Sequence, residues 1–590
     1  MESEPSAGFA NYVTAKNCSG IESMDDKLQS SMVLANTVDK AWAKELYEVD
    51  ALERENIIHE IHGLKSNRSV QETPEFVTGK IRALKEYIDA NLEEPLDNGD
   101  SIVPPVTKIA YKRGVYRLHS NYLRTKAFLL KFLRACHFDI KKAALRYFRY
   151  VDLLYELFGD IALTRPLALS DLTKRELRYL KKGQMQLLPS RDRAGRRMYA
   201  FSGCDDWNYN IREKYRTNVY LIDVLSDDET TQKLGAVTLN APRVGTGNNP
   251  FGFEGMTLRI GKQELFGNGK FTEPEFFRKV NEALPVRLTG IHYFAPNTII
   301  YNIGKAIILS MLGKEDRKII RFHAGSQLEC DYSLRSFGIP HEDLTITEGD
   351  NIKTKNVQKF LKARQSIEAH REQQRKRKEQ QHKNKNKNPV ESLSSLPPLE
   401  DDYDELAGES CPGIECPEVD CIVFGDKTLN NHPANVEFRE ILKIMERDRE
   451  QNKNSYKNNS INSDSPGDED KTQSTATVPI KEFIEQIIRI AKSPQHNLQF
   501  LVFDKQTHLF MKIDDHNELC KRVSQALRDQ RKRFRLEDSR HQQQEQSLPF
   551  NVGGNRNEYA LSTGSMMGAD AAKRLKRASR SGSCLPAFCS

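Results

Sequence analysis

The sequence predicts an α/β protein with an N-terminal helical bundle, a helix-covered and mostly parallel β-sheet, and a small α+β C-terminal domain joined by a disordered linker. Three observations predict this class. Apolar residues recur at helical spacing through the first quarter of the chain, and short apolar strands then alternate with helical stretches. A polar, strongly basic stretch separates these from a last group of helices and strands.

Composition limits the kind of protein that this chain can be. Of its 590 residues, 38% are hydrophobic and 29% charged, which is typical of globular domains diluted by solvated chain. The most hydrophobic stretch, residues 306–312, is far shorter than the roughly 20 residues that span a bilayer. The N-terminus lacks a signal-peptide pattern, and the ten cysteines lack the density of a disulfide scaffold. We therefore expect an intracellular protein with reduced thiols.

The first quarter of the chain carries helical signals. Residues 1–37 are polar and aperiodic, so we expect a disordered tail, followed by a helical region over 38–165 in which apolar residues such as Trp42 recur every three to four positions. Thr73 followed by a proline predicts a capped helix start. Asp139 predicts the cap of a helix that runs from Ile140 to Phe158.

Short apolar strands alternate with helices in the next region, 166–362. The clearest strands cover residues 197–201, 235–239, 287–294 and 319–322. Alternation of this kind predicts a mostly parallel sheet covered by helices.

The last part of the chain is divided by composition. We expect a basic and polar linker, a small α+β domain with a disordered insert, and a disordered tail, over residues 363–418, 419–533 with insert 451–477, and 534–590. Basic clusters at 371–387 and 573–580 imply an anionic partner. They are compatible with nuclear localisation signals or with tethers to a membrane.

Four ordered segments in the central region carry a family resemblance. They are Phe132-Leu-Arg-Ala-x-x-Phe-Asp139, Asp192-Arg-Ala-Gly195 entering a strand, Leu284-Pro-Val-Arg287 leading to Tyr293-Phe-Ala-Pro296, and Phe337-Gly-Ile-Pro340. In this order they resemble the CRAL-TRIO family, which includes tocopherol transfer protein and fungal phosphatidylinositol transfer protein. The resemblance covers roughly residues 120–345. It implies an α/β lipid-binding domain with no catalytic chemistry, no metal and no cofactor apart from a bound lipid.

The resemblance also implies which residues surround the lipid. The expected pocket is lined from the sheet and its approaches by Tyr199, Phe201, Val237, Leu239, Val286, Leu288, Ile291, Tyr293 and Phe294. In the phosphatidylinositol-binding branch a Glu follows the proline equivalent to Pro285, and Val286 stands there in this chain. This departure argues against phosphatidylinositol as the ligand and leaves a neutral or less polar lipid open.

An apolar helix follows Pro296, where the family has a mobile gate over the pocket. We expect its gating residues to be Ile299, Ile300, Ile303, Gly304, Ile307, Ile308, Met311 and Leu312. By composition alone, this segment is better interpreted as an ordinary buried helix of an α/β sheet, and the gate is what the resemblance implies. Basic residues beside it, expected to meet lipid headgroups and an anionic leaflet, are Arg287, Lys314, Arg317, Lys318 and Arg321.

The C-terminal module resembles a domain of unknown function from unicellular algae. The resemblance rests on Asp420-Cys-Ile-Val-Phe-Gly425 and His432-Pro-Ala-Asn435, with Cys421, Lys427 and Ala434 departing from the family pattern. Its helix, helix, hairpin, helix order with basic residues in the last helix also suits a winged-helix nucleic-acid binder.

The sequence therefore predicts a monomeric, cytoplasmic protein that associates peripherally with membranes and exchanges a hydrophobic lipid, for transfer or for sensing. The alternative is a nuclear regulator with a lipid-sensing domain and a DNA-binding C-terminal module. A catalytically inert scaffold, its pocket filled by side chains, is a third hypothesis.

Several apparent catalytic or metal sites do not fit the pattern that their chemistry needs. His59 and His62 lack the i, i+4 spacing of a zinc helix, and Cys411, Cys416 and Cys421 lack a CxxC pair. His323 invites comparison with hydrolases, but no Gly-x-Ser-x-Gly elbow exists in the sequence.

Overall fold

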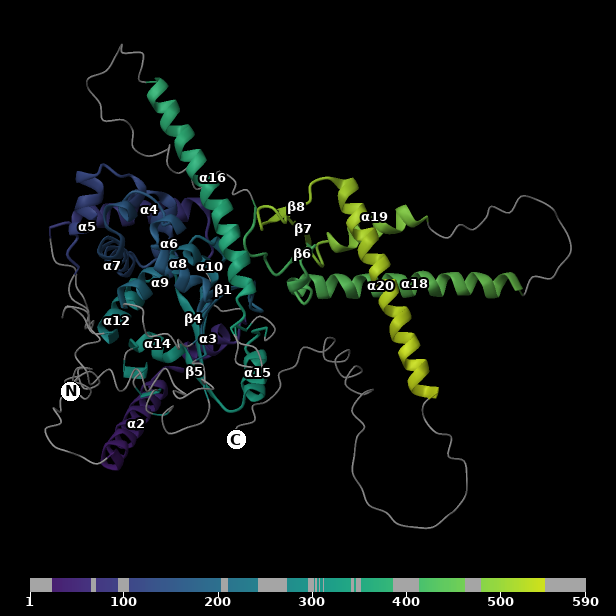
Figure 1. Ribbon diagram of the computed structural model, residues 1–590, viewed down its shortest axis with the longest axis horizontal. Coiled ribbons are helices and arrows are strands. Elements are labelled where there is room, and N and C mark those ends of the chain that lie inside the picture. The colour runs from purple at the N-terminus through teal and green to yellow at the C-terminus, as the bar shows by residue number, and fades with distance from the viewer. Residues whose placement is uncertain are drawn as a thin grey trace. The chain divides into compact units, whose positions relative to one another are not determined.

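The computed structural model describes residues 24–64, 70–93, 106–202, 211–241, 273–295, 302, 305–306, 308–310, 312–340, 344–345, 352–385, 413–461 and 479–546. In these residues, N-terminal helices, a five-stranded mostly parallel sheet and a second, three-stranded sheet confirm the predicted mixed α/β class (Figure 1). The chain divides into two units, Met1–Leu527, which contains both sheets, and Arg528–Ser590. No helix in the described part of the chain is long and apolar enough to cross a membrane.

The N-terminal helices precede the first sheet. The longer ones are α2 (Met24–Tyr47), α3 (Ala51–Ile61), α4 (Pro74–Ala90), α6 (Lys126–Ala135), α7 (Ile140–Phe158) and α8 (Lys174–Lys181). Short turns are α5 (Ile109–Lys112), η1 (Arg113–Arg117), η2 (Tyr122–Arg124), η3 (Gly159–Leu163) and η4 (Leu169–Asp171). Because α2 begins at Met24, the prediction of a disordered tail over 1–37 was wrong for residues 24–37.

Two predicted helix starts are confirmed by their caps. The Thr73 hydroxyl accepts a hydrogen bond from the Phe76 N–H at 3.2 Å, and α4 begins at Pro74. The Asp139 carboxylate accepts from the Lys142 N–H at 3.1 Å, and α7 spans the predicted residues. These helices pack through a large aromatic core that includes the fully buried Tyr147.

The first sheet has the strand order β1-β2-β3-β4-β5. Its strands are β1 (Met185–Arg191), β2 (Arg197–Ser202), β3 (Ala236–Ala241), β4 (Leu288–Ala295) and β5 (Ile320–Ala324). Only β1 runs antiparallel to its neighbour, and the other strands are parallel, as predicted. Gly235 enters β3 with a φ of +85°, and a Cβ there would lie 2.4 Å from Thr289 Cγ2, so this position requires glycine.

Helices follow the strands of this sheet along the chain. They are α9 (Ile211–Ser226), α10 (Glu229–Leu234), α12 (Glu273–Ala283), α14 (Lys314–Ile319), α15 (Gln327–Ser336) and α16 (Lys355–Lys385). Because α16 is one continuous helix, residues 363–385 are not the expected linker. At the other end of that range, Ile414 pairs with Phe510, so residues 413–418 also have defined structure.

The C-terminal module contains the second sheet. Its elements are β6 (Cys421–Phe424), η8 (Lys427–Leu429), α18 (Pro433–Ile461), α19 (Ile480–Ala491), β7 (Gln499–Phe503), β8 (Phe510–Lys512) and α20 (His516–Gln546). The predicted strand pair is confirmed, because β7 and β8 are antiparallel, and β6 pairs with β7 in parallel. Two boundaries were wrong: α18 continues through residues 451–461 of the expected insert, and α20 continues through 534–546 of the expected tail.

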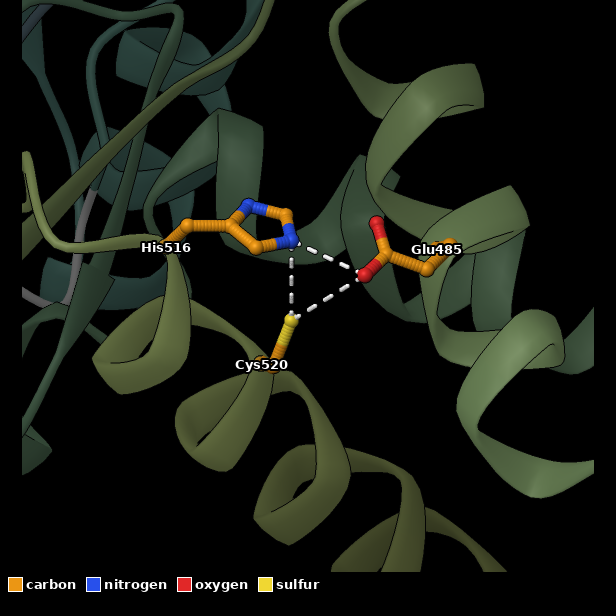
Figure 2. A group of neighbouring side chains, drawn as sticks. All are labelled: Glu485, His516 and Cys520. Carbon is orange, nitrogen blue, oxygen red and sulfur yellow. Dashed lines mark hydrogen bonds and ion pairs between the residues drawn. The ribbon is translucent and has the colours of Figure 1, made fainter.

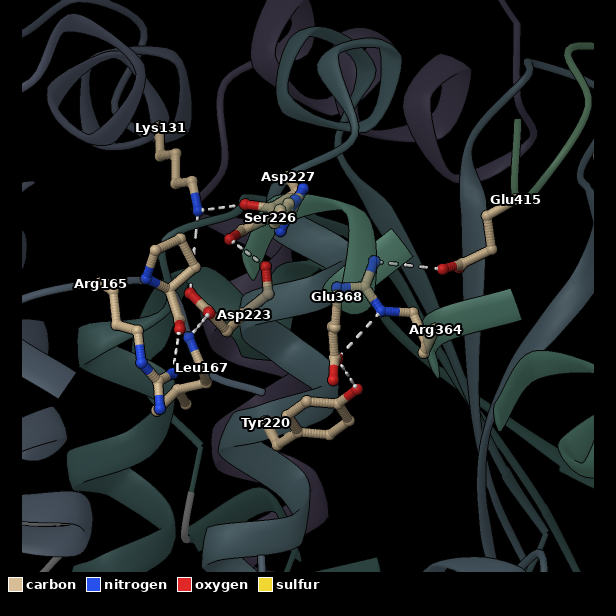
Figure 3. Close-up of polar contacts among 12 residues, drawn as sticks. Lys131, Arg165, Leu167, Tyr220, Asp223, Ser226, Asp227, Arg364, Glu368 and Glu415 are labelled. Carbon is tan, nitrogen blue, oxygen red and sulfur yellow. Dashed lines mark hydrogen bonds and ion pairs between the residues drawn. The ribbon is translucent and has the colours of Figure 1, made fainter. Parts of the chain in front are cut away.

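A set of mostly buried charges lies among the helices around the first sheet (Figure 3), and Arg371 of α16 joins it by pairing with Asp227 at 3.0 Å. Lys131 Nζ lies 2.7 Å from Asp227 Oδ1 and 3.7 Å from Asp223 Oδ1. Asp223 also accepts hydrogen bonds from the Tyr150 hydroxyl and the Leu167 N–H, at 3.0 and 3.2 Å. Burial raises the pKa of Asp223; burial would also raise that of Asp227, but Lys131 and nearby arginines outweigh it and hold that pKa below its usual range.

Replacing Lys131 with methionine tests this set of charges. The variant leaves two buried carboxylates without their nearest cation, and we expect a loss of about 3–5 kcal/mol in the free energy of unfolding, measured with urea. The control is Lys44→Met, because the Lys44–Glu48 pair spans 3.9 Å with side chains 79% and 55% exposed. We expect little change in the control. Equal losses in the two variants would contradict this account.

Candidate functional site

One face of the first sheet is closed to solvent. Met198 pairs with Val237 and Ala200 with Leu239, so these four side chains lie on the same face of β2 and β3. None of them is more than 2% exposed. We call this the closed face. Because Val237 and Leu239 lie on it, the predicted pocket wrongly combined residues of two faces.

The opposite face, which we call the aromatic face, carries most of the predicted pocket residues. Its members from the prediction are Tyr199, Phe201, Leu288, Ile291 and Tyr293. Ile291 is 5% exposed, and the other four pack against the apolar clusters but are not completely buried, although they project from strands in the interior of the sheet. An interior strand of a filled core would bury such side chains completely. This face is therefore less completely covered than the closed face.

Two predicted pocket residues need separate comment. Val286 is 1% exposed, but it belongs to the large core shared with the N-terminal helices and precedes β4. The side chain of Phe294 lies outside the described residues.

The predicted gating helix is described in part. Ile308, Leu309 and Leu312 are at most 5% exposed and share one apolar cluster with Ile291 of the aromatic face. Ile299, Ile300, Ile303, Gly304, Ile307 and Met311 lie outside the described residues. The described residues of this segment are thus buried, as expected both for a closed gate and for an ordinary core helix.

The predicted membrane-facing cations contact acidic residues from the N-terminal helices. The guanidinium of Arg287 pairs with Glu60 of α3 at 2.5 Å, and its side chain is 16% exposed. Lys318 Nζ lies 2.9 Å from Glu53, also of α3, and 2.9 Å from Glu315. These contacts were missed because the sequence does not reveal which acidic helix packs beside the basic segment.

Helix α2 contributes two further contacts of the same kind. Arg317 makes a bidentate pair with Glu45, with both N–O distances 2.7 Å, and the Trp42 indole N–H donates to the Arg317 carbonyl at 2.9 Å. Lys305, beside the predicted gate, lies 2.9 Å from Asp39. We call α2 and α3 together the acidic arm. Its apolar anchors are Ala35, Val38, Ile57 and Ile61, with Val49 between the two helices, and they belong to the apolar cluster that contains both the closed-face residues and Ile291.

The two remaining predicted headgroup residues differ from each other. Arg321 is half-buried and donates hydrogen bonds to the carbonyls of Lys318 and Ile320, and burial lowers the pKa of its guanidinium. Lys314 is exposed at the start of α14. Of the five predicted cations, Lys314 is thus the one that the described structure presents most openly to solvent.

A histidine pair on β4 and β5 is the most chemically distinctive group near the sheet. His292 Nδ1 and His323 Nε2 are 3.0 Å apart, and the Ser333 hydroxyl lies 2.8 Å from His323 Nδ1. Burial, followed by the charge of Arg321, lowers the pKa of His323 to about 4, and burial also lowers that of His292. A base this weak, oriented by a second histidine instead of a carboxylate, is poorly suited to activate a serine. We interpret the pair as structural.

The His-Pro-x-Asn segment of the C-terminal module has a clear structural role. Asn435 accepts a hydrogen bond from the Val423 N–H at 2.8 Å and donates to the carbonyls of Val423 and Leu429, at 3.1 and 2.9 Å. It thereby ties the start of α18 to β6. His432 is buried, which lowers its pKa to about 4, and it lines a cavity of about 500 Å³ together with Arg193.

Comparison with known proteins does not assign the chain to a family. No protein-family model matches the chain, and no curated protein resembles it closely enough to be counted as a match.

Stability should depend on pH through the histidine pair. Because the folded-state pKa of His323 is about 4 instead of 6.5, the unfolded state binds protons more readily, and the free energy of unfolding falls as pH drops from about 6.5 to 4. At about 1.4 kcal/mol per pKa unit, His323 contributes about 3 kcal/mol of this loss. Urea unfolding of His323→Gln between pH 7 and 4 should give a flatter profile than the parent protein. A variant profile as steep as the parent profile would contradict this assignment.

Proposed function

We propose that this protein binds a hydrophobic lipid against the aromatic face of its first sheet and exchanges that lipid with anionic membranes. The observation that supports this is the contrast between the two faces. Tyr199, Phe201 and Tyr293 remain half-buried on interior strands, whereas the closed face is sealed. An apolar ligand would complete the cover of these aromatic side chains. The CRAL-TRIO resemblance points to the same region and the same class of ligand.

The chemistry of the aromatic face suits binding better than catalysis. The Tyr199 hydroxyl on this face is already engaged, because it donates a hydrogen bond to Asn218 Oδ1 of α9 at 2.9 Å. Each CH₂ group removed from water contributes about 0.8 kcal/mol, so an acyl chain of about fifteen such groups gains on the order of 12 kcal/mol. A bilayer offers nearly the same gain, so exchange between protein and membrane costs little. Val286, where a Glu would contact inositol, favours a neutral or less polar lipid.

The acidic arm suggests how exchange is controlled. Arg287, Arg317 and Lys318 are the cations that would meet lipid phosphates, and each now contacts a carboxylate of the arm. We propose that the arm leaves these cations when the protein docks, so that lipid phosphates replace the carboxylates. Basic residues near an anionic leaflet each contribute about 1 kcal/mol of attraction to it. Cations freed from the carboxylates of the arm would therefore add this attraction to membrane binding.

The ligand proposal is tested by Tyr293→Asp. A carboxylate on the aromatic face disfavours an acyl chain because the ion must lose its hydration, and we expect native mass spectrometry of the full chain to show at least tenfold less co-purified lipid. Leu288→Asp places the same charge earlier on β4 and serves if the first variant does not fold.

The matched control for this test is Tyr332→Asp, the same change at a residue of α15 that is 64% exposed. It should retain the parent lipid content. Lipid retained in both aromatic-face variants, or no lipid in the parent protein under gentle conditions, would contradict the proposal.

The control by the acidic arm is tested by the double variant Glu45→Lys with Glu53→Lys. Charge reversal repels Arg317 and Lys318, releases the arm, and should increase sedimentation with phosphatidylserine vesicles at least tenfold at low salt. High salt should cancel the increase.

A second double variant, Glu48→Lys with Glu55→Lys, controls for net charge. It adds the same charge at Glu48, just after α2, and at Glu55 of α3, whose side chains are 55% and 62% exposed and pair with Lys44 and His59. Equal vesicle binding by both double variants would show that the added positive charge alone is responsible, and would contradict control by the arm.

A further inference from the structure

Three side chains with metal-ligating atoms converge on the surface of the C-terminal module (Figure 2). Glu485 comes from α19, and His516 and Cys520 come from the first turns of α20. Glu485 Oε1 lies 2.8 Å from His516 Nε2, and Cys520 Sγ lies 3.5 Å from the same nitrogen. The sulfur and the carboxylate oxygen are 3.8 Å apart. A nitrogen, a sulfur and an oxygen donor thus surround one point.

The packing of the two helices holds these donors together. His516 and Cys520 are four residues apart and therefore lie on the same side of α20. Below them, Ile487 of α19 and Val523 of α20 are fully buried in one apolar cluster. The Asp515 carboxylate accepts hydrogen bonds from the N–H groups of Asn517 and Glu518, at 3.1 and 3.2 Å, which fixes the first turn.

The separations between donors suit a tetrahedral zinc ion. Zinc bonds of about 2.3 Å to sulfur and about 2.0–2.2 Å to nitrogen and oxygen place tetrahedral donors roughly 3.3–3.6 Å apart. The nitrogen–sulfur distance of 3.5 Å lies within that range. The nitrogen–oxygen distance of 2.8 Å is about 0.5 Å too short and the sulfur–oxygen distance of 3.8 Å about 0.2 Å too long, differences that side-chain rotation can supply. We propose that Glu485, His516 and Cys520 form a zinc site that links α19 to α20.

The proposed site has three protein ligands and an open fourth position. The side chain of His516 is 57% exposed and that of Glu485 is 34% exposed, so water or a donor from a partner can complete the coordination. With a neutral imidazole, the carboxylate and the thiolate balance the charge of a divalent cation. This proposal does not depend on the lipid-binding proposal, because the aromatic face contributes none of the three ligands.

The alternative is a histidine–carboxylate ion pair with a thiol beside it. The same module provides a comparison for that alternative: His496 Nδ1 lies 2.6 Å from Glu437 Oε1, and the described cluster there includes no cysteine. If ion pairing alone explained the geometry, the two histidines would respond alike to zinc.

Calorimetric titration of the metal-stripped full chain with Zn²⁺ tests the proposal. We expect one high-affinity equivalent whose affinity falls at least tenfold in Cys520→Ser and in His516→Gln, with no change in the control His496→Gln. Zinc should also raise the unfolding temperature of the parent protein more than that of either site variant. Titration with Co²⁺ should produce a thiolate charge-transfer absorption that Cys520→Ser abolishes.

Two results would overturn the site. One is the absence of a high-affinity equivalent in the parent protein. The other is zinc binding that persists undiminished in both Cys520→Ser and His516→Gln, which would assign the metal to other thiols of the chain.

Discussion

Burial of charge on α16 is the constraint that holds separate parts of the first unit together. Arg364 of this helix lies 3.3 Å from Glu415, and Glu368 accepts a hydrogen bond from the Tyr220 hydroxyl at 2.8 Å. One turn further on, Arg371 reaches Asp227 at 3.0 Å. These contacts connect α16 to α9 and to the segment before β6, residues distant in sequence. Because a buried charge without a partner is costly, each contact also restricts where its partners can lie.

Pairing of buried charges also changes how the basic residues beside the predicted gate are interpreted. Counted along the sequence, Arg287, Arg317 and Lys318 predict an open positive surface. In the folded chain their partners are the carboxylates of the acidic arm, so their charge is largely satisfied within the molecule. An anionic membrane must then compete with these carboxylates, and any attraction to lipid depends on the position of α2 and α3. Net charge alone could not predict this, since it contains no information about tertiary pairing.

Local signals in the sequence predicted much of the fold. The caps at Thr73 and Asp139 and the strands of the parallel sheet required only residue type and spacing. The α16 helix was missed because its second half is almost entirely polar, which is also typical of a solvated linker, and its stability comes from contacts at its first half. The two faces of the sheet were confused at Val237 because alternation along one strand does not reveal the register of its neighbour. The group of Glu485, His516 and Cys520 was missed because Glu485 lies 31 residues from His516.

The separation of the two faces bears on how a binding protein of this kind stays folded with and without its ligand. The closed face is sealed by apolar residues, and the stacked histidine pair on β4 and β5 packs edge-to-face against Phe337. The aromatic core of the N-terminal helices lies against the aromatic face, because Tyr199, Phe201 and Leu288 pack on it. Loading or losing an apolar ligand on the aromatic face would leave the packing of the closed face intact, even where it alters contacts between the aromatic side chains and the N-terminal core. The sheet can remain folded with its aromatic face incompletely covered because the opposite face of the same strands is completely packed.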